Sequence, residues 1–326
     1  MRIVVFGVGA IGGVIAGALA DAGHEVAGIA RGSQLSAVRD HGLKLYSHNR
    51  HITAHIDCVV HPSALKPRPD DILFLCTKSQ DTAAALIALR EAGYRNQPVF
   101  CAQNGVANER MALRAFPHVH GVTVMMPASC LTPGEVTIYS QPRFGIFELG
   151  RFPHGIDSDD ERMAAILDSA NIAGFALEHV MDSKYGKLRM NLSNILEALL
   201  GVGANFGNFP KLLREEADDA LAAARIRWVD VGRNDPRRAA MLNMTEVAGR
   251  PRVGCSTTQS LRKSSGSVET DYLNGEISQI GRMHGVPTPL NNFVVSVAQK
   301  VARDREQAGS WTLEQLATAY DAFVNG

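Results

Sequence analysis

The sequence predicts an α/β fold in which an N-terminal, doubly wound parallel sheet is followed by an all-helical C-terminal domain. Two observations favour this fold class. Short apolar runs alternate with helical segments in the first half of the chain, as in the strands and crossover helices of a parallel sheet. From Ser183 onward, apolar residues recur at helical spacing almost throughout. We therefore expect a boundary near Met181, with domains at residues 1–181 and 182–326.

The chain opens with the pattern of a Rossmann-like βαβ unit. Arg2–Phe6 is a β-branched apolar strand, a glycine-rich turn follows it, and Ala10–Ala22 has helical periodicity. In this context Gly7 makes the tight turn, Gly9 lets backbone approach a pyrophosphate, and Gly12 lets the helix pack closely on the strand. The pyrophosphate would rest on N–H groups at the helix N-terminus. The expected cofactor-binding residues of this turn are Gly7, Val8, Gly9, Ala10, Ile11 and Gly12.

The same stretch also resembles a secretory signal, because Arg2 precedes an uncharged run that extends to Ala20. The glycines within this run would make a poor signal helix, since each costs about 1 kcal/mol relative to alanine. In addition, the predicted strand Glu25–Ala30 arrives where a βαβ unit needs its second strand. We therefore expect a folded βαβ unit at the start of the chain.

Arg31 follows this second strand, at the position that selects between the two nicotinamide dinucleotides. A site that prefers NAD usually has Asp or Glu about 20 residues beyond the glycines, where it bonds the ribose 2′-hydroxyl. A guanidinium instead suits the 2′-phosphate of NADP(H), which a carboxylate would repel. The sequence therefore predicts NADP(H) as the cofactor, with a solvated loop arginine as the alternative.

The remaining elements of the first domain include two strands that are continuous apolar runs, Asp71–Cys76 and Pro98–Ala102, as expected of parallel strands covered on both faces. Lys78 and Asn104 follow these strands at the sheet edge where ligands bind. We expect both Lys78 and Asn104 to serve the cofactor or active site, with a solvated lysine and a simple turn as the alternatives.

The first domain contains further predicted elements. The other predicted strands are Leu43–Ser47, Ile52–Val60, Val119–Met126, Glu135–Tyr139, Arg143–Leu149 and Phe175–Val180. The other predicted helices are Gln34–Asp40, Asp81–Ala92, Ala107–Ala115 and one that ends at Ala170.

Composition excludes several classes of function. Lys and Arg together number 33, as do Asp and Glu, and no basic run is present, so neither nucleic acid nor an anionic membrane surface is expected as a partner. No other apolar stretch is long enough to span a bilayer. The five cysteines are scattered without a CxxC pair, which suits a reducing compartment and argues against a zinc site. We expect a cytoplasmic protein without a metal ion.

The first predicted helix of the second domain carries a polar stripe. Lys187, Asn191 and Asn194 recur at positions i, i+4 and i+7, apart from the apolar positions of the same helix. Spacing alone leaves this stripe as either a solvated face or the wall of a hydrogen-bonding cleft. Further on, Ser267 suits the N-cap of a helix in which Glu269 would share the apolar face. An inward carboxylate needs a partner, and Lys187 is the obvious candidate.

The motifs of the second domain resemble the ketopantoate reductase (2-dehydropantoate 2-reductase) family. They are Tyr185-Gly186-Lys187-Leu188 with Asn191, the pair Ser256-Thr257, and the run Val268-Glu269-Thr270-Asp271-Tyr272-Leu273-Asn274-Gly275. The glycine turn, Lys78, Asn104-Gly105 and His284-Gly285-Val286-Pro287 fit the same family pattern. The resemblance spans nearly the whole chain, and these second-domain motifs are far more specific than the glycine fingerprint alone.

The resemblance implies that the protein reduces 2-dehydropantoate, a small 2-oxo acid, to pantoate with NADPH, in pantothenate and coenzyme A biosynthesis. It makes Lys187 the proton donor and Glu269 a ligand of both substrate and cofactor. It also implies that Asn104 is a neighbour of the nicotinamide. Asn191 and either Ser256 or Thr257 would contact the substrate.

The sequence departs from the family pattern at one position. The family commonly has a second asparagine four residues after the first, where this chain has Ile195, with Asn194 one residue earlier. One residue on a helix is about 100° of rotation, so Asn194 would not simply replace the missing side chain, although it stays a substrate-binding candidate. Ketopantoate is the leading substrate. The alternatives are another branched 2-oxo acid, an opine-type dehydrogenase and, least expected, an NADP(H) sensor without turnover; a homodimer is left open.

Overall fold

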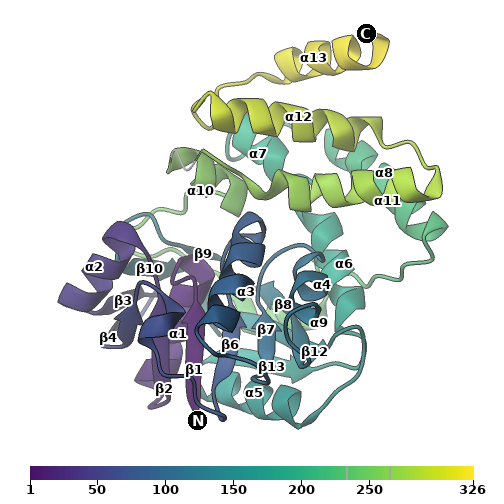
Figure 1. Cartoon of the computed structure of the whole chain (residues 1–326). Coiled ribbons are helices and arrows are strands. Elements are labelled where there is room, and N and C mark those ends of the chain that lie inside the picture. The colour runs from purple at the N-terminus through teal and green to yellow at the C-terminus, as the bar shows by residue number, and fades with distance from the viewer. Residues whose placement is uncertain (233, 264–265) are drawn as a thin grey trace. The chain divides into compact units, whose positions relative to one another are not determined.

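The computed structural model describes residues 1–232, 234–263 and 266–326, and within them the chain divides into two compact units (Figure 1). The first unit comprises Met1–Lys184 together with Asp230–Arg252, and the second comprises Tyr185–Val229 and Val253–Gly326. The first junction lies three residues beyond Met181. The return of residues 230–252 to the first unit is a feature that the sequence prediction did not contain.

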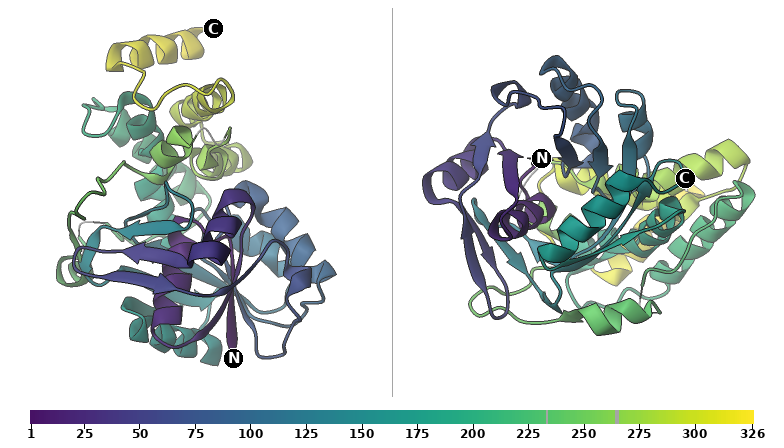
Figure 2. Two further views of the ribbon diagram at one scale, coloured as in Figure 1. Left: turned by 90° about the vertical axis from the view of Figure 1, so that its left-hand side faces the viewer. Right: turned by 90° about the horizontal axis from the view of Figure 1, so that it is seen from below.

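The first unit is built around an eight-stranded sheet with the strand order β13-β12-β8-β7-β6-β1-β2-β5. Its members are β1 (Arg2–Phe6), β2 (Glu25–Ile29), β5 (Asp57–Val59), β6 (Ile72–Leu75), β7 (Val99–Cys101), β8 (Val119–Met125), β12 (Gly145–Arg151) and β13 (Ile172–Ala176). The ladders are parallel except that β12 runs antiparallel to β8. Figure 2 shows the strands fanning out, as the twist of such sheets requires.

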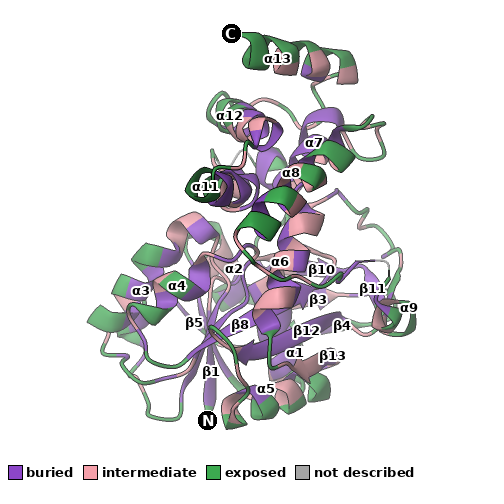
Figure 3. Cartoon of the chain, turned by 90° about the vertical axis from the view of Figure 1, so that its right-hand side faces the viewer, coloured by how far each residue is buried: buried purple, intermediate pink, exposed green. Residues whose placement is uncertain are grey.

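Helices cover both faces of this sheet, and β1 shows why. Ile3 and Val5 face a core that includes residues of α1 (Ala10–Asp21) and α5 (Ser158–Ser169), whereas Val4 faces a second core with α3 (Thr82–Glu91) and α4 (Asn108–Leu113). A strand buried on both faces must be apolar at every position, which explains the continuous apolar runs. The inner strands β6, β7 and β8 are accordingly buried along their length, and β8 can be followed in Figure 3. The predicted doubly wound α/β class is confirmed.

A smaller sheet packs on α1, in the order β4-β3-β10-β9. Its strands are β3 (Leu43–Tyr46), β4 (His51–Ala54), β9 (Ala128–Ser129) and β10 (Glu135–Ile138). The single strand predicted at Ile52–Val60 is wrong, because the chain leaves the small sheet after β4 and enters the edge of the main sheet as β5. The strand predicted at Phe175–Val180 is also misplaced, since β13 ends at Ala176 and Val180 begins a helix.

Residues 230–252 return to the first unit through a short helix, α9 (Pro236–Met241), and a strand, β14 (Leu242–Met244). β14 pairs antiparallel with β11 (Ser140–Pro142). Arg237 of α9 forms ion pairs with Asp235 and with the buried carboxylate of Glu148 in β12, and its guanidinium lies 5.1 Å from the ring centre of Phe175. These contacts attach the segment to the main sheet.

Helices are the regular secondary structure of the second unit within its described residues. α6 (Val180–Asn191) leads into it, and its other helices are α7 (Asn194–Leu200), α8 (Phe209–Ala223), α10 (Ser256–Arg262), the 3₁₀ helix η3 (Glu269–Tyr272), α11 (Asn274–His284), α12 (Pro289–Arg303) and α13 (Leu313–Asn325). This confirms the predicted helical C-terminal region. Across both units, none of the described helices combines the length and the apolar character that crossing a membrane would need. The small helix α2 (Gly32–His41) belongs to the first unit.

Candidate active site

The glycine-rich turn joins β1 to α1 at the carboxyl end of the central strand. Gly7 has a φ of 101°, and a Cβ on Gly12 would lie 2.1 Å from the carbonyl oxygen of Gly7, so the turn and the close helix contact both require glycine. A Cβ on Gly9 would meet nothing within 4 Å, so the backbone there borders open space. Within the described residues, no side chain caps the N-terminus of α1. Open backbone at an uncapped helix N-terminus fits a bound pyrophosphate.

Arg31 lies between β2 and α2, at the same sheet edge as the glycine turn, because Phe6 and Ile29 are partners in the parallel ladder. Its side chain is 73% exposed, and its Nη2 atom lies 3.7 Å from Oδ1 of Asp81. An exposed ion pair at that distance contributes little stability. The guanidinium can therefore turn toward an anionic ligand at small cost.

The loops after β6 and β7 carry Lys78 and Asn104, which are both partly buried. The backbone oxygen of Asn104 accepts hydrogen bonds from the hydroxyl of Ser79 at 3.4 Å and from the side-chain amide of Asn108 at 3.1 Å. Asn108 also donates to the Ser79 hydroxyl at 3.1 Å. The structure therefore brings the two predicted loops together at one edge of the sheet.

Three buried polar side chains that the sequence analysis did not single out complete this network. Gln103 donates to the hydroxyl of Thr82 at 2.7 Å, and Thr82 donates to the side-chain oxygen of Asn108 at 2.8 Å. Gln103 also donates to the Thr77 hydroxyl at 3.3 Å. A sequence signal exists for Gln103, because a polar residue that closely follows a buried parallel strand lies at the sheet edge where ligands bind. Thr82 and Asn108 begin α3 and α4 and lack this signal.

In the second unit, the polar stripe predicted on one helix is divided between two helices. Lys187 and Asn191 lie on α6, which ends at Asn191, whereas Asn194 begins α7. The carbonyl oxygen of Leu192, in the intervening turn, accepts a hydrogen bond from the side-chain amide of Asn274 at 3.1 Å. A side chain that takes a helical carbonyl interrupts the helix. Asn194 therefore does not lie on a continuation of α6, and the rotation of about 100° per residue along one helix does not exclude it as a substrate contact.

Cys255 attaches the N-terminus of α10 to the same turn region. Its thiol donates to the backbone oxygen of Asn194 at 3.3 Å, and its N–H donates to the carboxylate of Glu197 on α7. The hydroxyl of Thr258 also donates to Glu197, at 3.0 Å. Burial raises the pKa of the Cys255 thiol to about 11, so it stays a neutral donor. These bonds fix the position of α10 against α7.

The two candidates at the start of α10 differ in exposure. Ser256 is exposed, whereas Thr257 is 3% exposed. The more exposed residue is the easier of the two for a ligand to reach. Ser256 is therefore the better placed of the two for a substrate contact.

Glu269 lies in the 3₁₀ helix η3 and is partly buried. The predicted α-helix capped by Ser267 is wrong here, because Val268 precedes the 3₁₀ turn and α11 begins only at Asn274. Glu269 therefore does not share an α-helical face with Ile277. Its pairing with Lys187 stays a prediction.

The segments that carry the second-domain candidates converge on one turn. Residues 192–194 follow Asn191, contact Cys255 next to Ser256, and contact Asn274, five residues after Glu269. All of these contacts lie inside the second unit. Direct hydrogen bonds that span up to 82 residues of sequence thus link three motifs around one turn.

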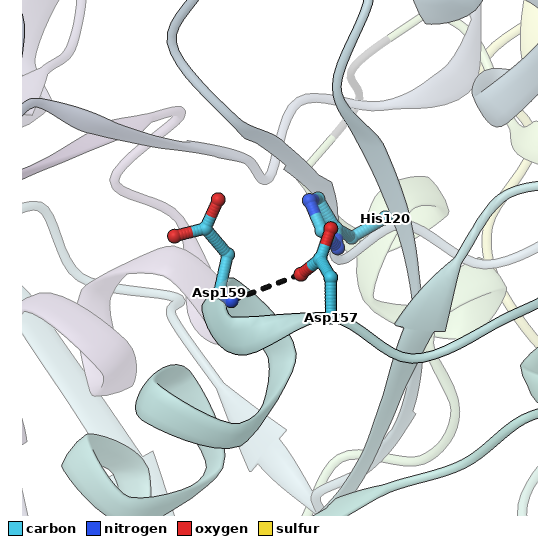
Figure 4. Close-up of side chains that lie close together, drawn as sticks. All are labelled: His120, Asp157 and Asp159. Carbon is cyan, nitrogen blue, oxygen red and sulfur yellow. Dashed lines mark hydrogen bonds between the residues drawn. The ribbon is translucent and has the colours of Figure 1, made fainter.

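One group of described residues has the composition of a metal site, namely His120, Asp157 and Asp159, whose candidate ligand atoms lie within 4.8 Å of one another (Figure 4). Asp157 is the N-cap of α5, and its carboxylate accepts the N–H groups of Asp159 and Asp160 and a guanidinium N–H of Arg151 at 2.8 Å. The Nδ1 atom of His120 lies 2.7 Å from Asp160. The Asp157 carboxylate and the Nδ1 atom of His120 thus have protein partners, and Asp159 pairs with Arg162 at 3.2 Å, so we interpret the cluster as a helix cap.

Comparison with known proteins identifies the family. Residues 3–153 match the family model "Ketopantoate reductase PanE/ApbA", and residues 179–302 match the model of its C-terminal domain. A curated relative, 2-dehydropantoate 2-reductase of Pyrococcus abyssi, is 26% identical over 302 residues, or 89% of this chain and 94% of the relative. The Lactococcus lactis enzyme of the same name is 23% identical over 311 residues, or 91% and 96%.

Solved structures agree with this assignment. A PanE/ApbA family ketopantoate reductase from Ralstonia eutropha JMP134 superimposes with a TM-score of 0.77 and 26% identity, over 94% of this chain and all of that one. D-Mandelate dehydrogenase in complex with NADH and anilino(oxo)acetate also gives a TM-score of 0.77, at 23% identity, over 94% and 100% of the two chains. This second likeness shows the shared fold. The family models cover most of the sequence, and the chain therefore belongs to the ketopantoate reductase family and is an oxidoreductase.

Proposed function

We propose that the protein reduces 2-dehydropantoate to pantoate with NADPH. The observation that carries the proposal is the convergence of three motifs on the turn after Asn191, because these motifs supply Lys187, Ser256 and Glu269. Lys187 could donate the proton that the reduction of a 2-oxo acid requires, Glu269 could orient this donor, and Ser256 could hydrogen-bond the substrate. Relatives named for this reaction match about nine tenths of the chain.

The cofactor-binding residues in this proposal belong to the first unit. Gly7, Val8, Gly9, Ala10, Ile11 and Gly12 would hold the pyrophosphate at the N-terminus of α1. Arg31 would pair with the 2′-phosphate, which is the reason to favour NADPH over NADH. Lys78 and Asn104 would bind nearer the nicotinamide, from the loops after β6 and β7. These residues would hold NADPH, and the chemistry that it would contribute is transfer of a hydride to the C2 carbonyl carbon of the substrate.

The second unit supplies the proton and the substrate contacts. The Lys187 ammonium would donate a proton to the C2 oxygen as negative charge develops on it. Glu269 would orient the ammonium by pairing with it. Asn191 and Ser256 would hydrogen-bond the substrate, so that the reacting carbonyl is held in one direction.

Asn194 is the proposed partner of the terminal hydroxyl of 2-dehydropantoate. The break between α6 and α7 removes the reason for excluding it, and its side chain is partly exposed while Ile195 is buried. A branched 2-oxo acid that lacks the hydroxyl is the alternative substrate, because the family's second asparagine is replaced here by Ile195. The two substrates differ in a single hydrogen bond, so they can be separated kinetically.

A test mixes the protein with NADPH and, in parallel, with 2-dehydropantoate, 3-methyl-2-oxobutanoate and the 2-oxo acid that corresponds to mandelate. NADPH oxidation is followed by absorbance, and the product is identified by mass spectrometry. The proposal expects the fastest oxidation with 2-dehydropantoate and the formation of pantoate. Tight binding of NADPH without oxidation by any of the acids would instead support a dinucleotide sensor.

A further inference from the structure

A buried lysine lies beneath the loop that carries Asn104. Lys184, near the start of α6, is 2% exposed, and its ammonium forms an ion pair with Glu109 of α4, which is fully buried. The same ammonium donates to the carbonyl oxygens of Gln103 at 3.0 Å and Cys101 at 3.3 Å, and lies 3.5 Å from that of Val122. One cation thus contacts α4, β8 and the end of β7 with its loop, and all of these groups belong to the first unit.

The fold makes room for this lysine. Gly121 of β8 lies opposite Cys101 in the parallel ladder. A Cβ on Gly121 would lie 3.1 Å from a methyl group of Val180 and 3.3 Å from Cδ of Lys184. A glycine at this point of the strand therefore lets α6 and the lysine stem approach the sheet.

The carbonyl contacts determine the conformation of the loop. The backbone oxygen of Gln103 is held by Lys184, and its side chain is held by Thr82. The next residue, Asn104, has its own carbonyl held by Ser79 and Asn108. With the peptide groups on both sides of its Cα held, the direction of the Cα–Cβ bond of Asn104 is set, and with it the region that the side chain can reach.

Stability alone does not account for the pair. A buried ion pair adds little stability compared with apolar residues of similar volume, because the cost of removing two charges from water offsets their attraction. What apolar residues could not reproduce is the ammonium contact with the carbonyls of Cys101 and Gln103. The distinctive contribution of Lys184 is therefore the geometry of the loop.

We infer that Lys184, paired with Glu109, is a positioning residue for the nicotinamide end of the cofactor site, acting through Asn104. The inference deepens the proposed function and rests on it, since it assumes that Asn104 lies beside the nicotinamide. The adenine end would be held by the glycine turn and Arg31, which lie outside the contacts described above for Lys184.

The test replaces both charges at once, as Lys184→Met together with Glu109→Leu, so that no buried charge is left unpaired. Affinity is measured for NADPH and for adenosine 2′,5′-bisphosphate, which carries the phosphates of the adenine half without a nicotinamide. The double variant should bind the bisphosphate within about twofold of wild type, while its NADPH affinity and its kcat each fall about 10-fold or more through misplacement of the reacting ring.

A matched control replaces another buried ion pair of the same unit. Arg2 bonds Asp71 through two N–H groups, at 2.9 and 2.8 Å, at the amino ends of β1 and β6. Arg2→Met with Asp71→Leu should leave both affinities and kcat near wild type. If the Lys184 and Glu109 double variant does not fold, Lys184→Arg keeps the charge pair but moves the donors, and the same split between the two ligands is expected.

Two results would overturn the inference. One is a folded double variant with wild-type NADPH affinity and kcat; the other is an equal loss of affinity for both ligands, which would indicate general damage to the unit. Failure of the proposed function gives a different result. A wild-type protein that binds NADPH but reduces no 2-oxo acid would refute the function, while the comparison of NADPH with the bisphosphate would still test the role of Lys184.

Discussion

The side-chain amide of Asn274 donates a hydrogen bond to the carbonyl oxygen of Leu192 at 3.1 Å, in the turn where α6 ends and α7 begins. The same amide bonds the side-chain oxygen of Asn291 at 3.0 Å, and Asn291 donates to Glu216 of α8 at 2.7 Å. Asn274 and Asn291 are buried. The turn that follows Asn191 is therefore fixed by a polar network that includes α8, α11 and α12.

We predict that Asn274→Ala destabilises the protein by about 2–3 kcal/mol, because it leaves the Leu192 carbonyl and the Asn291 side chain buried without this partner. It should also lower kcat, since the turn beside Asn191 loosens. Urea unfolding and steady-state kinetics measure the two effects. Ser278→Ala is the matched control, because its buried hydroxyl donates to the carbonyl oxygen of Asn274 one turn earlier in the same helix, and its loss should cost less than about 1 kcal/mol. Equal costs for the two variants would argue against a network that specifies the turn.

Arg31→Ala should reduce the preference for NADPH over NADH. Loss of a charge-assisted pair with the 2′-phosphate costs about 1.5–3 kcal/mol, which is about 10- to 150-fold in affinity. Both dinucleotides are titrated against wild type and variant. Arg68→Ala is the control, because it removes an exposed arginine that pairs with Glu25 at the amino end of β2. The assignment of Arg31 fails if wild type and Arg31→Ala show the same preference.

Acidity should weaken the attachment of residues 230–252. The hydrogen bond from the Arg237 guanidinium lowers the pKa of Asp235 below its usual value. A carboxylate with a lowered folded pKa stabilises the protein above its unfolded pKa of about 4, and this contribution is lost as pH falls through the folded pKa. Asp235→Asn removes the contribution at every pH. The difference in unfolding free energy between wild type and variant should therefore be constant near neutrality and shrink below about pH 4. A difference that does not change with pH would contradict this account.

Lys187→Ala should lower kcat by about 10²-fold or more while NADPH affinity stays close to wild type, because proton donation acts in the transition state. Stopped-flow turnover and a separate NADPH titration distinguish the two quantities. Lys211→Ala is a suitable control, since Lys211 is an exposed lysine of the same unit that pairs with Glu215. A Lys187→Ala enzyme with wild-type kcat would make Lys187 part of a solvated face.

The sequence predicted those features that depend on local pattern. The glycine turn was predictable because the conformation and close packing that require Gly7 and Gly12 arise within a few residues of sequence. The buried strands were predictable because a strand that is covered on both faces is apolar throughout. The break after Asn191 was not predictable, since it depends on Asn274, which lies 82 residues further along the chain. The role of Lys184 depends in the same way on Glu109 and Gly121, which are distant in the sequence. The pattern of residues around Lys184 does not predict these contacts.

Ile195 is the position where the sequence and the family pattern disagree, and it leads to the most direct test of the proposed reaction. The measurement is the ratio of kcat/KM for 2-dehydropantoate to that for 2-oxo-3,3-dimethylbutanoate, which has the same branching but no hydroxyl. A site built to bond a hydroxyl rejects the analogue that lacks it by as much as ~10⁴-fold, whereas an apolar pocket barely discriminates. With Asn194 available to receive the hydroxyl, we expect a ratio above ~10². A ratio near one would contradict 2-dehydropantoate as the substrate of this enzyme.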